Sequence, residues 1–432
     1  MRISEDLRDL SLILVSPNVS EEMGGEAIKA LQIYLEFERT GAMVHQITHE
    51  RVKTELARKF PKMNVSYVKD GLVQKALYRL GLLNPSLSAA SGAVIALIFQ
   101  WRAAHLVKAL IEDKPDSIVH FTSPISPVLP YFATGTATVV IGPLNGNIYY
   151  PPAFRHREPI PDHVRRWLHP HLQRLQRFIL PGKARAAALL VAGGERTLKS
   201  LRMGGCREGQ FVESLDSGVT DEFQQSPRIR HSGPSYRFVH FGRLVKFKGT
   251  DALIRSLLQT RTPIELDIIG RGPELGALKK LTEALGLSNR VKFLDWITDR
   301  SLLAETFGRY RALVLPSLAE ANGIVVQEAM ALGLPVIALN WGGPALLVTP
   351  ETGILVEPLS EEYVLTELAK AMDRLAQDGE VAERMSIAGR HLANEQGFLW
   401  SALIRKWAEL YRVVSHRRNP NWQQSRLVRT QS

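Results

Sequence analysis

The sequence has almost no cysteine, since Cys206 is the one cysteine in 432 residues. A single cysteine excludes a disulfide within the chain and fits a reducing compartment. The sequence also lacks the pattern of a secretory signal near its start, where an acidic stretch precedes a very short apolar run (MRISEDLRDLSLILVS). We therefore expect a cytoplasmic protein.

Long apolar runs are missing as well. The best candidate, AASGAVIALIF over 89–99, is shorter than the roughly 20 residues that cross a bilayer. Hydrophobic residues make up 45% of the chain and charged residues 22%, which is typical of soluble proteins, and 432 residues are more than one domain usually contains. We expect two domains and no membrane span.

Acidic residues are fewer than basic ones, which gives a net charge of +11. Such a charge suits binding to nucleic acid or to an anionic membrane surface, and it also suits simple solubility. The basic residues are scattered and are not interleaved with aromatic residues in one groove. The pattern therefore does not favour a nucleic-acid-binding protein, which stays the least favoured alternative.

Short apolar segments alternate with helical patterns along both halves of the chain, as in parallel α/β sheets. The fold class predicted is α/β, with two doubly wound Rossmann-like domains and a ligand cleft between the carboxyl ends of their strands. The predicted boundaries are a first domain over 1–215, a linker over 216–235, a second domain over 236–399, a docked helix over 400–418 and a tail over 419–432 whose composition favours disorder.

The segment EANGIVVQEAMALGLPVI over 320–337 follows a predicted buried strand, ALVLP. Glu320 then lies in a turn and Glu328 in the second turn of a helix that begins near Gly323. The backbone amides of Gly323, Ile324 and Val325 point outward at the positive end of this helix, which suits a phosphate. The alternative is that the two glutamates are only favourable charges near a helix start.

Two cations follow an earlier predicted strand in FGRLVKFKG, residues 241–249. The strand ends at Gly242, and Arg243 and Lys248 could together neutralise a diphosphate, because Arg offers a planar fork and Lys a mobile point charge. Alone, such a pair is also typical of a solvated loop.

A further strand runs into IIGRGPELG, residues 268–276. The spacing of Gly270, Gly272 and Gly276 has one residue too many for a dinucleotide-binding fingerprint, which argues against an NAD-dependent oxidoreductase. We interpret Gly270 and Gly272 as allowing a close approach of the turn to the cleft.

These motifs, followed by NWGGPA and TGILVEP in this order, resemble the nucleotide-sugar domain of retaining glycosyltransferases of family 4, which have the GT-B fold. The resemblance covers residues 236–358 well and the N-terminal half more thinly. It implies a GT-B arrangement in which the C-terminal helix packs back on the N-terminal domain.

The resemblance also implies roles for individual residues. A donor such as a UDP-, GDP- or ADP-sugar would bind without a metal or other cofactor, with Arg243 and Lys248 on its diphosphate, Glu320 on the sugar hydroxyls and Glu328 on the ribose. Residues expected to line the donor site are Gly24, Gly25, Gly242, Gly270, Gly272, Asn322, Gly323, Ile324, Val325 and Glu328.

In the N-terminal half, Gly24 and Gly25 resemble the family's glycine loop beside the diphosphate and acceptor. His120 stands where the family often has a histidine that faces the donor sugar, and we count it with Arg243, Lys248 and Glu320 as a catalytic candidate. The alternative is a satisfied polar residue at a strand end. The loop GPLNGN over 142–147 resembles one found at the cleft of members that build bacterial polysaccharides.

The chain departs from the family at two places. Ala321 and Asn322 stand where Gly-Phe is usual, so contacts to the sugar are expected to differ, and Leu346 replaces a glutamate that many members have. The departure at Ala321 and Asn322 makes this pair our first candidate for the choice of donor sugar.

The expected function is metal-independent, retaining transfer of a hexose from a nucleotide sugar to a glycan or lipid-linked acceptor, in the synthesis of cell-surface polysaccharide. A sugar-nucleotide epimerase with the same two-domain architecture is the nearest alternative. The basic segment over 163–185 has apolar residues at near-helical spacing, so it suits either an anionic inner-membrane surface or packing within the first domain.

Overall fold

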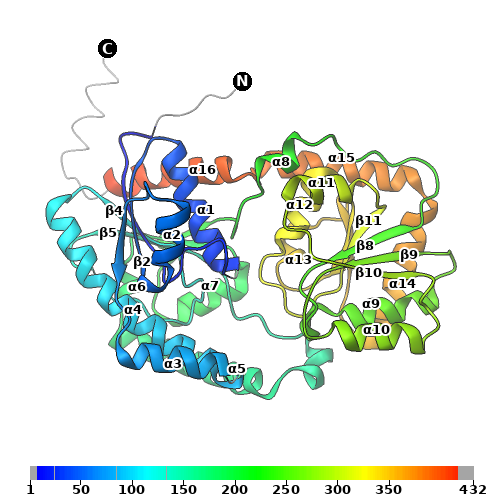
Figure 1. The fold of residues 1–432 in the computed structure, drawn as a ribbon, viewed down its shortest axis with the longest axis horizontal. Coiled ribbons are helices and arrows are strands. Elements are labelled where there is room, and N and C mark those ends of the chain that lie inside the picture. Colours follow the sequence, from blue (N-terminus) through cyan, green and yellow to red (C-terminus); the bar gives the residue numbers. More distant parts are fainter. Residues whose placement is uncertain (1–6, 24, 84, 133, 417–432) are drawn as a thin grey trace, which may run out of the picture. The chain divides into compact units, whose positions relative to one another are not determined.

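The structure is a computed structural model that describes residues 7–23, 25–83, 85–132 and 134–416. The predictions for Gly24 and for the tail over 419–432 lie outside the described residues. The chain divides into two compact units, which Figure 1 shows in ribbon form. The first contains residues up to Asn147, Val164–Asp216 and those from Ser401, and the second contains Ile148–His163 and Ser217–Trp400.

The described residues of the first unit form a seven-stranded parallel sheet in the order β3-β2-β1-β4-β5-β6-β7. Its strands are short and mostly buried, as expected for a parallel sheet covered on both faces. They are β1 (Ser11–Val15), β2 (Met43–His49), β3 (Val65–Val68), β4 (Ile118–Phe121), β5 (Thr138–Leu144), β6 (Ala188–Val191) and β7 (Phe211–Glu213).

Helices cover this sheet, and the last of them comes from the far end of the chain (Figure 1). They are α1 (Gly25–Arg39), α2 (Lys53–Lys59), α3 (Leu72–Leu83), α4 (Pro85–Asp113), α5 (Ile160–Ile179), α6 (Gly182–Arg185), α7 (Gly194–Met203) and α16 (Trp400–His416), with 3₁₀ turns over Glu50–Val52 and Glu208–Gln210. The α16 helix packs on the first unit, where Trp407 and Tyr411 are buried and the Trp407 indole donates to Ser214 Oγ at 3.0 Å.

One described segment, Val94–Asp113 of α4, is long and apolar enough to cross a membrane, although 44% of it is buried inside the protein. Phe99, Ala103, Val107 and Ile111 of this segment belong to the core of the first unit. A core helix of a soluble protein meets the same criteria, so this feature is weak evidence for a membrane span.

The second unit contains a six-stranded parallel sheet in the order β10-β9-β8-β11-β12-β13. The strands are β8 (Arg237–Phe241), β9 (Glu265–Ile269), β10 (Val291–Leu294), β11 (Ala312–Leu315), β12 (Val336–Leu339) and β13 (Gly353–Val356). The helices are α8 (Asp221–Gln225), α9 (Thr250–Ser256), α10 (Leu275–Ala284), α11 (Arg300–Phe307), α12 (Ile324–Leu332), α13 (Pro344–Leu347), α14 (Glu361–Gln377) and α15 (Gly379–Glu395), with 3₁₀ turns over Pro152–Arg157, Lys246–Lys248 and Leu257–Gln259.

The unit boundaries differ from the predicted ranges in two places. Residues 148–163, assigned to the first domain from sequence, join the second unit because Tyr150 and Phe154 enter its core. Residues 217–235, predicted as a linker, also pack on the second unit, where Phe223 and Ile229 are buried. Composition alone assigns this polar segment to a loop. Its few apolar residues nevertheless bury themselves in the second unit and hold the segment there.

Candidate functional site

The order of the second sheet selects two loops as the place for a ligand. The chain runs from β8 to β9 on one side and later places β11 on the other side of β8. In parallel sheets, ligands bind at the carboxyl ends of the strands where the order reverses in this way. The loop after β8 and the loop after β11 therefore define the candidate site, and they carry Arg243, Lys248 and Glu320.

Main-chain contacts hold these two loops together. The amide of Leu318 donates to the carbonyl of Phe247 at 2.7 Å. Gly249, with φ of 67°, lies so near the other loop that a Cβ atom there would be 2.2 Å from the carbonyl oxygen of Pro316. As a result, the Lys248 ammonium and the Glu320 carboxylate form an ion pair, and their side chains are 13% and 15% exposed.

Arg243 lies in the same loop with an exposed side chain and makes no ion pair with any described residue. Gly242, at the end of β8, leaves room for Lys248, because a Cβ atom on this glycine would lie 3.8 Å from Lys248 Cε. The loop thus offers two exposed cations, Arg243 and Lys246, and one cation, Lys248, already paired with a carboxylate.

A pair of glycines after β12 supports the main chain of Glu320. The amide of Gly343 donates to the carbonyl of Glu320 at 2.8 Å. Gly342 has φ of 68°, and a Cβ atom there would lie 2.4 Å from that same carbonyl oxygen. The two glycines of NWGGPA therefore hold the Glu320 loop in place, a role that the sequence analysis did not assign to them.

The α12 helix begins directly after this loop. Gly323 precedes it with φ of 75°, a conformation that favours glycine. The amides of Ile324 and Val325 occupy the first helical positions and have no acceptor within the helix, so they point toward the loop region with the positive end of the helix dipole. This arrangement suits an anion next to Lys248.

Glu328 is buried in the second turn of α12. Its Oε1 atom accepts a hydrogen bond from Arg300 at 2.9 Å, and its Oε2 atom has no partner among the described residues. Burial raises the pKa of Glu328 to about 7, and the nearby Arg300 offsets only part of this effect. A buried carboxylate oxygen without a partner is suited to accept a hydrogen bond from a hydroxyl group of a ligand.

Gly270 and Gly272 pack against the main chain of the loop after β8. A Cβ atom on Gly270 would lie 2.0 Å from the carbonyl oxygen of Gly242, and one on Gly272 would lie 2.2 Å from that of Leu244. The Leu244 amide also donates to the Arg271 carbonyl at 2.8 Å. These glycines thus position the loop that carries Arg243 and Lys248.

Asn322 directs its side chain toward other parts of the second unit. Its Nδ2 atom donates to Ser217 Oγ at 2.7 Å and to Gln327 Oε1 at 3.2 Å. The side chain therefore connects the loop before α12 to Ser217, and both hydrogen bonds of Nδ2 are made within the second unit.

His120 in the first unit is fully buried at the end of β4. Its Nε2 atom lies 2.8 Å from the carbonyl oxygen of Gly142 and must donate to it, so Nδ1 accepts from the Tyr411 hydroxyl at 2.6 Å. Burial lowers the pKa of His120 to about 4. Both nitrogens are engaged within the protein, so the geometry favours the structural role for this histidine.

The other predicted residues of the first unit are less informative. Gly25 begins α1 and is exposed, with no atom within 4 Å of a Cβ built on it. In the loop GPLNGN, Arg196 donates to Asn145 Oδ1 at 2.8 Å and to the carbonyl of Gly146 at 3.2 Å. The structure therefore brings the predicted residues of the second unit together, while those of the first unit lie in a separate body.

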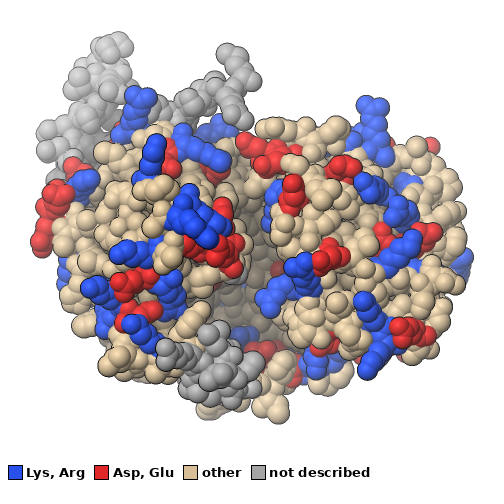
Figure 2. Space-filling model, viewed as in Figure 1, with Lys and Arg blue, Asp and Glu red and all other residues tan. Residues whose placement is uncertain are grey.

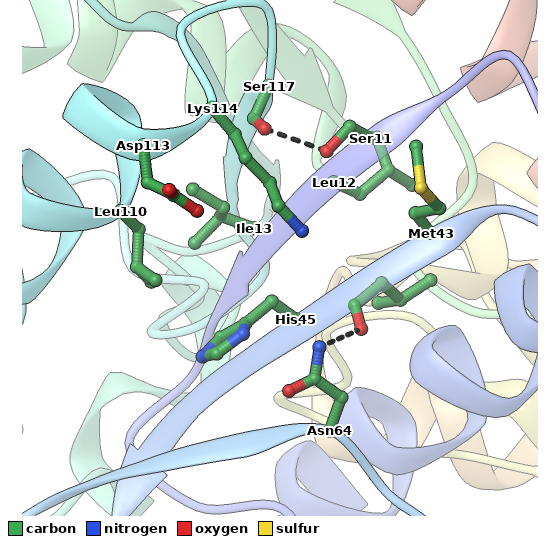
Figure 3. A pocket seen from close by; sticks show the side chains of 11 residues that line it. Ser11, Leu12, Ile13, Met43, His45, Asn64, Leu110, Asp113, Lys114 and Ser117 are labelled. Atoms are coloured by element: carbon green, nitrogen blue, oxygen red, sulfur yellow. Dashed lines mark hydrogen bonds between the residues drawn. The ribbon is translucent and has the colours of Figure 1, made fainter.

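A pocket of about 480 Å³ lies in the first unit, at the amino ends of strands β1 and β2 (Figure 3). It is lined by residues where β1 and β2 begin and where α4 ends, including Ser11, Met43 and Lys114. Ser11 and Ser117 share a hydrogen bond of 2.7 Å at its wall. Its place at the amino ends of the strands separates it from the carboxyl ends, where ligands of such sheets bind.

The charges on the visible face do not form a continuous basic groove. Figure 2 shows Lys and Arg interspersed with Asp and Glu over this face of the molecule. Several cations are also paired, such as Arg271 with Asp295 and Arg412 with Asp9. This distribution does not support the nucleic-acid-binding alternative on the face shown.

A sequence model of the family described as "Glycosyl transferases group 1" matches residues 221–392. This part of the chain is therefore similar to the group 1 glycosyltransferases. The match contains every residue of the candidate site in the second unit, from Gly242 to Glu328. The resemblance found in the motifs is thereby confirmed.

Curated relatives of this part of the chain include a GDP-mannose-dependent alpha-(1-6)-phosphatidylinositol monomannoside mannosyltransferase of Mycobacterium tuberculosis, which is 34% identical over 221 residues, 46% of this chain and 56% of the relative. The alignments span about half the length of the curated relatives that the chain matches first. The similarity in sequence is thus confined to part of each protein.

Solved structures match the chain over almost its full length. A glycosyltransferase from Rickettsia africae has a TM-score of 0.64 and 16% identity, covering 94% of this chain and 98% of that one. The Anabaena protein HepE in complex with UDP and glucose has a TM-score of 0.60 and 18% identity, covering 93% and 99%. The predicted GT-B fold with two Rossmann-like units is confirmed.

Arg300, the partner of Glu328, is not predictable from the sequence. This arginine opens α11 after the helix-capping Asp299, and a single arginine at a helix start carries no signal of such a contact. The role of the Gly342 and Gly343 pair could have been suspected, because two adjacent glycines often mark a close approach of main chain.

Proposed function

We propose that the protein is a metal-independent, retaining glycosyltransferase that moves a sugar from a nucleoside diphosphate sugar to a hydroxyl of a glycan or lipid-linked acceptor. The observation that carries this proposal is the convergence of Lys248, Glu320 and the start of α12 at the switch point of the second sheet. The similarity of residues 221–392 to the group 1 glycosyltransferases supports the glycosyl-transfer chemistry.

The charges suit a diphosphate leaving group. As the bond between the anomeric carbon and the diphosphate breaks, negative charge grows on the departing oxygen, and groups already aimed there lower the barrier. Arg243, Lys248 and the amides of Ile324 and Val325 supply positive charge and hydrogen-bond donors in one small region. We propose no metal, because the family that the motifs resemble uses none. Arg243, Lys248 and the two amides would neutralise the diphosphate charge instead.

The carboxylates suit the sugar and the nucleoside. We place Glu320 on hydroxyls of the donor sugar and Glu328 on the ribose, because Glu328 Oε2 has no partner among the described residues. The acceptor oxygen would then bond to the anomeric carbon on the face that the diphosphate leaves, and its proton would pass to the leaving phosphate oxygen. The products are a glycosylated acceptor with retained configuration and a nucleoside diphosphate.

The acceptor class and pathway belong to the proposal too. The name of the Mycobacterium tuberculosis relative includes phosphatidylinositol monomannoside, a lipid-linked sugar. Together with the loop GPLNGN, this supports a role in making cell-surface polysaccharide, with the enzyme in the cytoplasm and peripheral to the inner membrane.

A thermal-shift screen against UDP, GDP and ADP, followed by a transfer assay, tests the proposal. The correct nucleotide at a hundredfold excess over its dissociation constant should stabilise the fold by about 2.7 kcal/mol. NMR of the product, formed with and without a chelator, should show the donor's anomeric configuration in both cases. Donor turnover without an acceptor would indicate the epimerase instead, and no stabilisation by any nucleotide would overturn the proposal.

A further inference from the structure

The α5 helix presents its apolar side outward. Of its 20 residues, from Ile160 to Ile179, the buried one is Gln173. Five apolar residues of the part that belongs to the first unit are between 52% and 78% exposed, namely Val164, Trp167, Leu175, Phe178 and Ile179. A surface helix of a globular protein normally turns such residues toward the core, so α5 has the reverse orientation.

The polar side of α5 makes the contacts with the first unit. The Gln173 amide donates to Ser200 Oγ, and the Gln176 amide donates to the carbonyl of Val128. At about 100° per residue, the five exposed apolar residues cover about 120° of the helix surface, and Gln173 lies opposite the middle of that arc. The sequence left open the alternative that this segment packs within the first domain. Such packing accounts for the polar side of α5 but not for its exposed apolar side.

Basic residues border the apolar arc on both sides. On the same projection, Arg174 lies about 20° beyond Trp167 and Arg165 lies about 40° beyond Ile179. The side chains of Arg165 and Arg174 are both exposed. Long basic side chains can extend from such a position to phosphate groups while the apolar residues between them enter the acyl region.

We propose that α5 is a docking helix for an anionic bilayer surface, into which Trp167, Leu175 and Phe178 insert while Arg165 and Arg174 contact lipid phosphates. A bilayer fits this surface better than a protein partner does, because the arc is convex, apolar except for His171, and flanked by one sign of charge only. The net charge of +11 favours the same surface. The docking is independent of the transfer reaction.

Sedimentation with vesicles tests the proposal on the full-length protein. The wild type should pellet with vesicles of phosphatidylcholine mixed with phosphatidylglycerol, and much less with phosphatidylcholine alone. Replacing both aromatic residues (Trp167→Ser with Phe178→Ser) should lower the partition coefficient by at least about tenfold. Replacing Arg174→Gln should lower it about fivefold on the anionic vesicles alone.

A matched control removes apolar residues of similar exposure elsewhere. Leu258 and Ile387 in the second unit are 56% and 52% exposed, and changing both to Ser should leave the partition coefficient unaltered. Circular dichroism should show that all variants are folded, because every substituted side chain is exposed. Equal loss in the control variant would overturn the assignment to α5.

Two other results would also overturn the proposal. The first is equal pelleting of the wild type with both kinds of vesicle, or with neither. The second is a dimer in light scattering that the Trp167 and Phe178 changes convert to a monomer, since a second copy of the chain would then cover the arc. Either result would remove the peripheral membrane location from the proposed function, but neither bears on nucleotide binding or sugar transfer, so the docking and the proposed reaction can fail separately.

Discussion

Lys248 and Glu320 form an ion pair in the second unit although 72 positions separate them in the sequence. Each residue lies in a loop that follows a parallel strand, and the two strands, β8 and β11, are neighbours. The pairing is therefore a consequence of the strand order. In the proposed reaction the two residues bind different parts of one donor, so the donor must compete with the ion pair.

Replacing Lys248→Ala should lower kcat by about 10² to 10³, because a charged donor aimed at the leaving group is lost. Steady-state kinetics with the donor found in the thermal-shift screen would measure this. Lys246, exposed in the same 3₁₀ turn, provides the control, and Lys246→Ala should be near wild type. A folded Lys248→Ala enzyme with unchanged turnover would remove Lys248 from the mechanism.

Replacing Glu320→Gln should separate binding of the nucleotide from turnover of the sugar. Without the competing carboxylate, Lys248 is free for the diphosphate, so affinity for the nucleoside diphosphate should rise by up to about fivefold. Turnover should fall because the contact with the sugar hydroxyls is lost. Calorimetry and kinetics on one preparation measure both effects, with Glu305→Gln, which breaks an exposed ion pair with Arg309, as the control. Weaker nucleotide binding by Glu320→Gln would contradict the competition.

The sequence was sufficient for the sheet positions and for the main charges of the site. Buried parallel strands such as β11 and β12 are continuous apolar runs, and the residues after them can be placed at one edge once the topology is known. Strands β3 and β7 were missed because they are short and only partly buried, so the apolar signal is weak.

Contacts of individual side chains could not be read from the sequence. Asn322 looked like a determinant of donor choice because it departs from the family motif, yet its amide is held by Ser217 and Gln327. His120 matched a family position, but its hydrogen-bond partner Tyr411 comes from a helix almost 300 positions later. Such partners depend on tertiary packing, which has no local signature in the sequence.

The pH dependence of stability should change in Glu328→Gln. The pKa of this carboxyl is about 7 in the folded protein against 4.5 as its ordinary value. Between these values the unfolded chain has released the proton and the folded protein keeps it, so stability falls as pH rises from 4.5 to 7.

Glutamine cannot ionise, so the stability of Glu328→Gln relative to wild type should increase by about 3 kcal/mol between pH 4.5 and pH 8. Urea unfolding at several pH values would show it, with Glu283→Gln on the exposed side of α10 as the control. A difference from wild type that is constant with pH would mean that Glu328 is ionised throughout this range.

Replacing Gly342→Ala should destabilise the protein by about 1 to 3 kcal/mol, since alanine is strained at positive φ and its methyl group would meet the Glu320 carbonyl. The Glu320 loop should shift, and donor affinity should fall with it. The opposite result is expected for Gly276→Ala, because Gly276 lies in α10 with no atom within 4 Å and alanine is the better helix former there. Thermal unfolding and nucleotide titration of both variants compare the two positions directly.

Replacing Tyr411→Phe tests the structural role of His120. The hydroxyl of Tyr411 donates to Nδ1 of a histidine that is fully buried, so its loss leaves a buried acceptor without a partner and should cost about 1 to 3 kcal/mol of stability. Because His120 is closed off on both nitrogens, kcat and its pH profile should stay as in the wild type. Tyr363→Phe, at a partly exposed tyrosine of α14, should alter neither property. If Tyr411→Phe instead kept full stability and changed the pH profile of kcat, His120 would have to reach the substrate in another conformation, and its catalytic assignment would be restored.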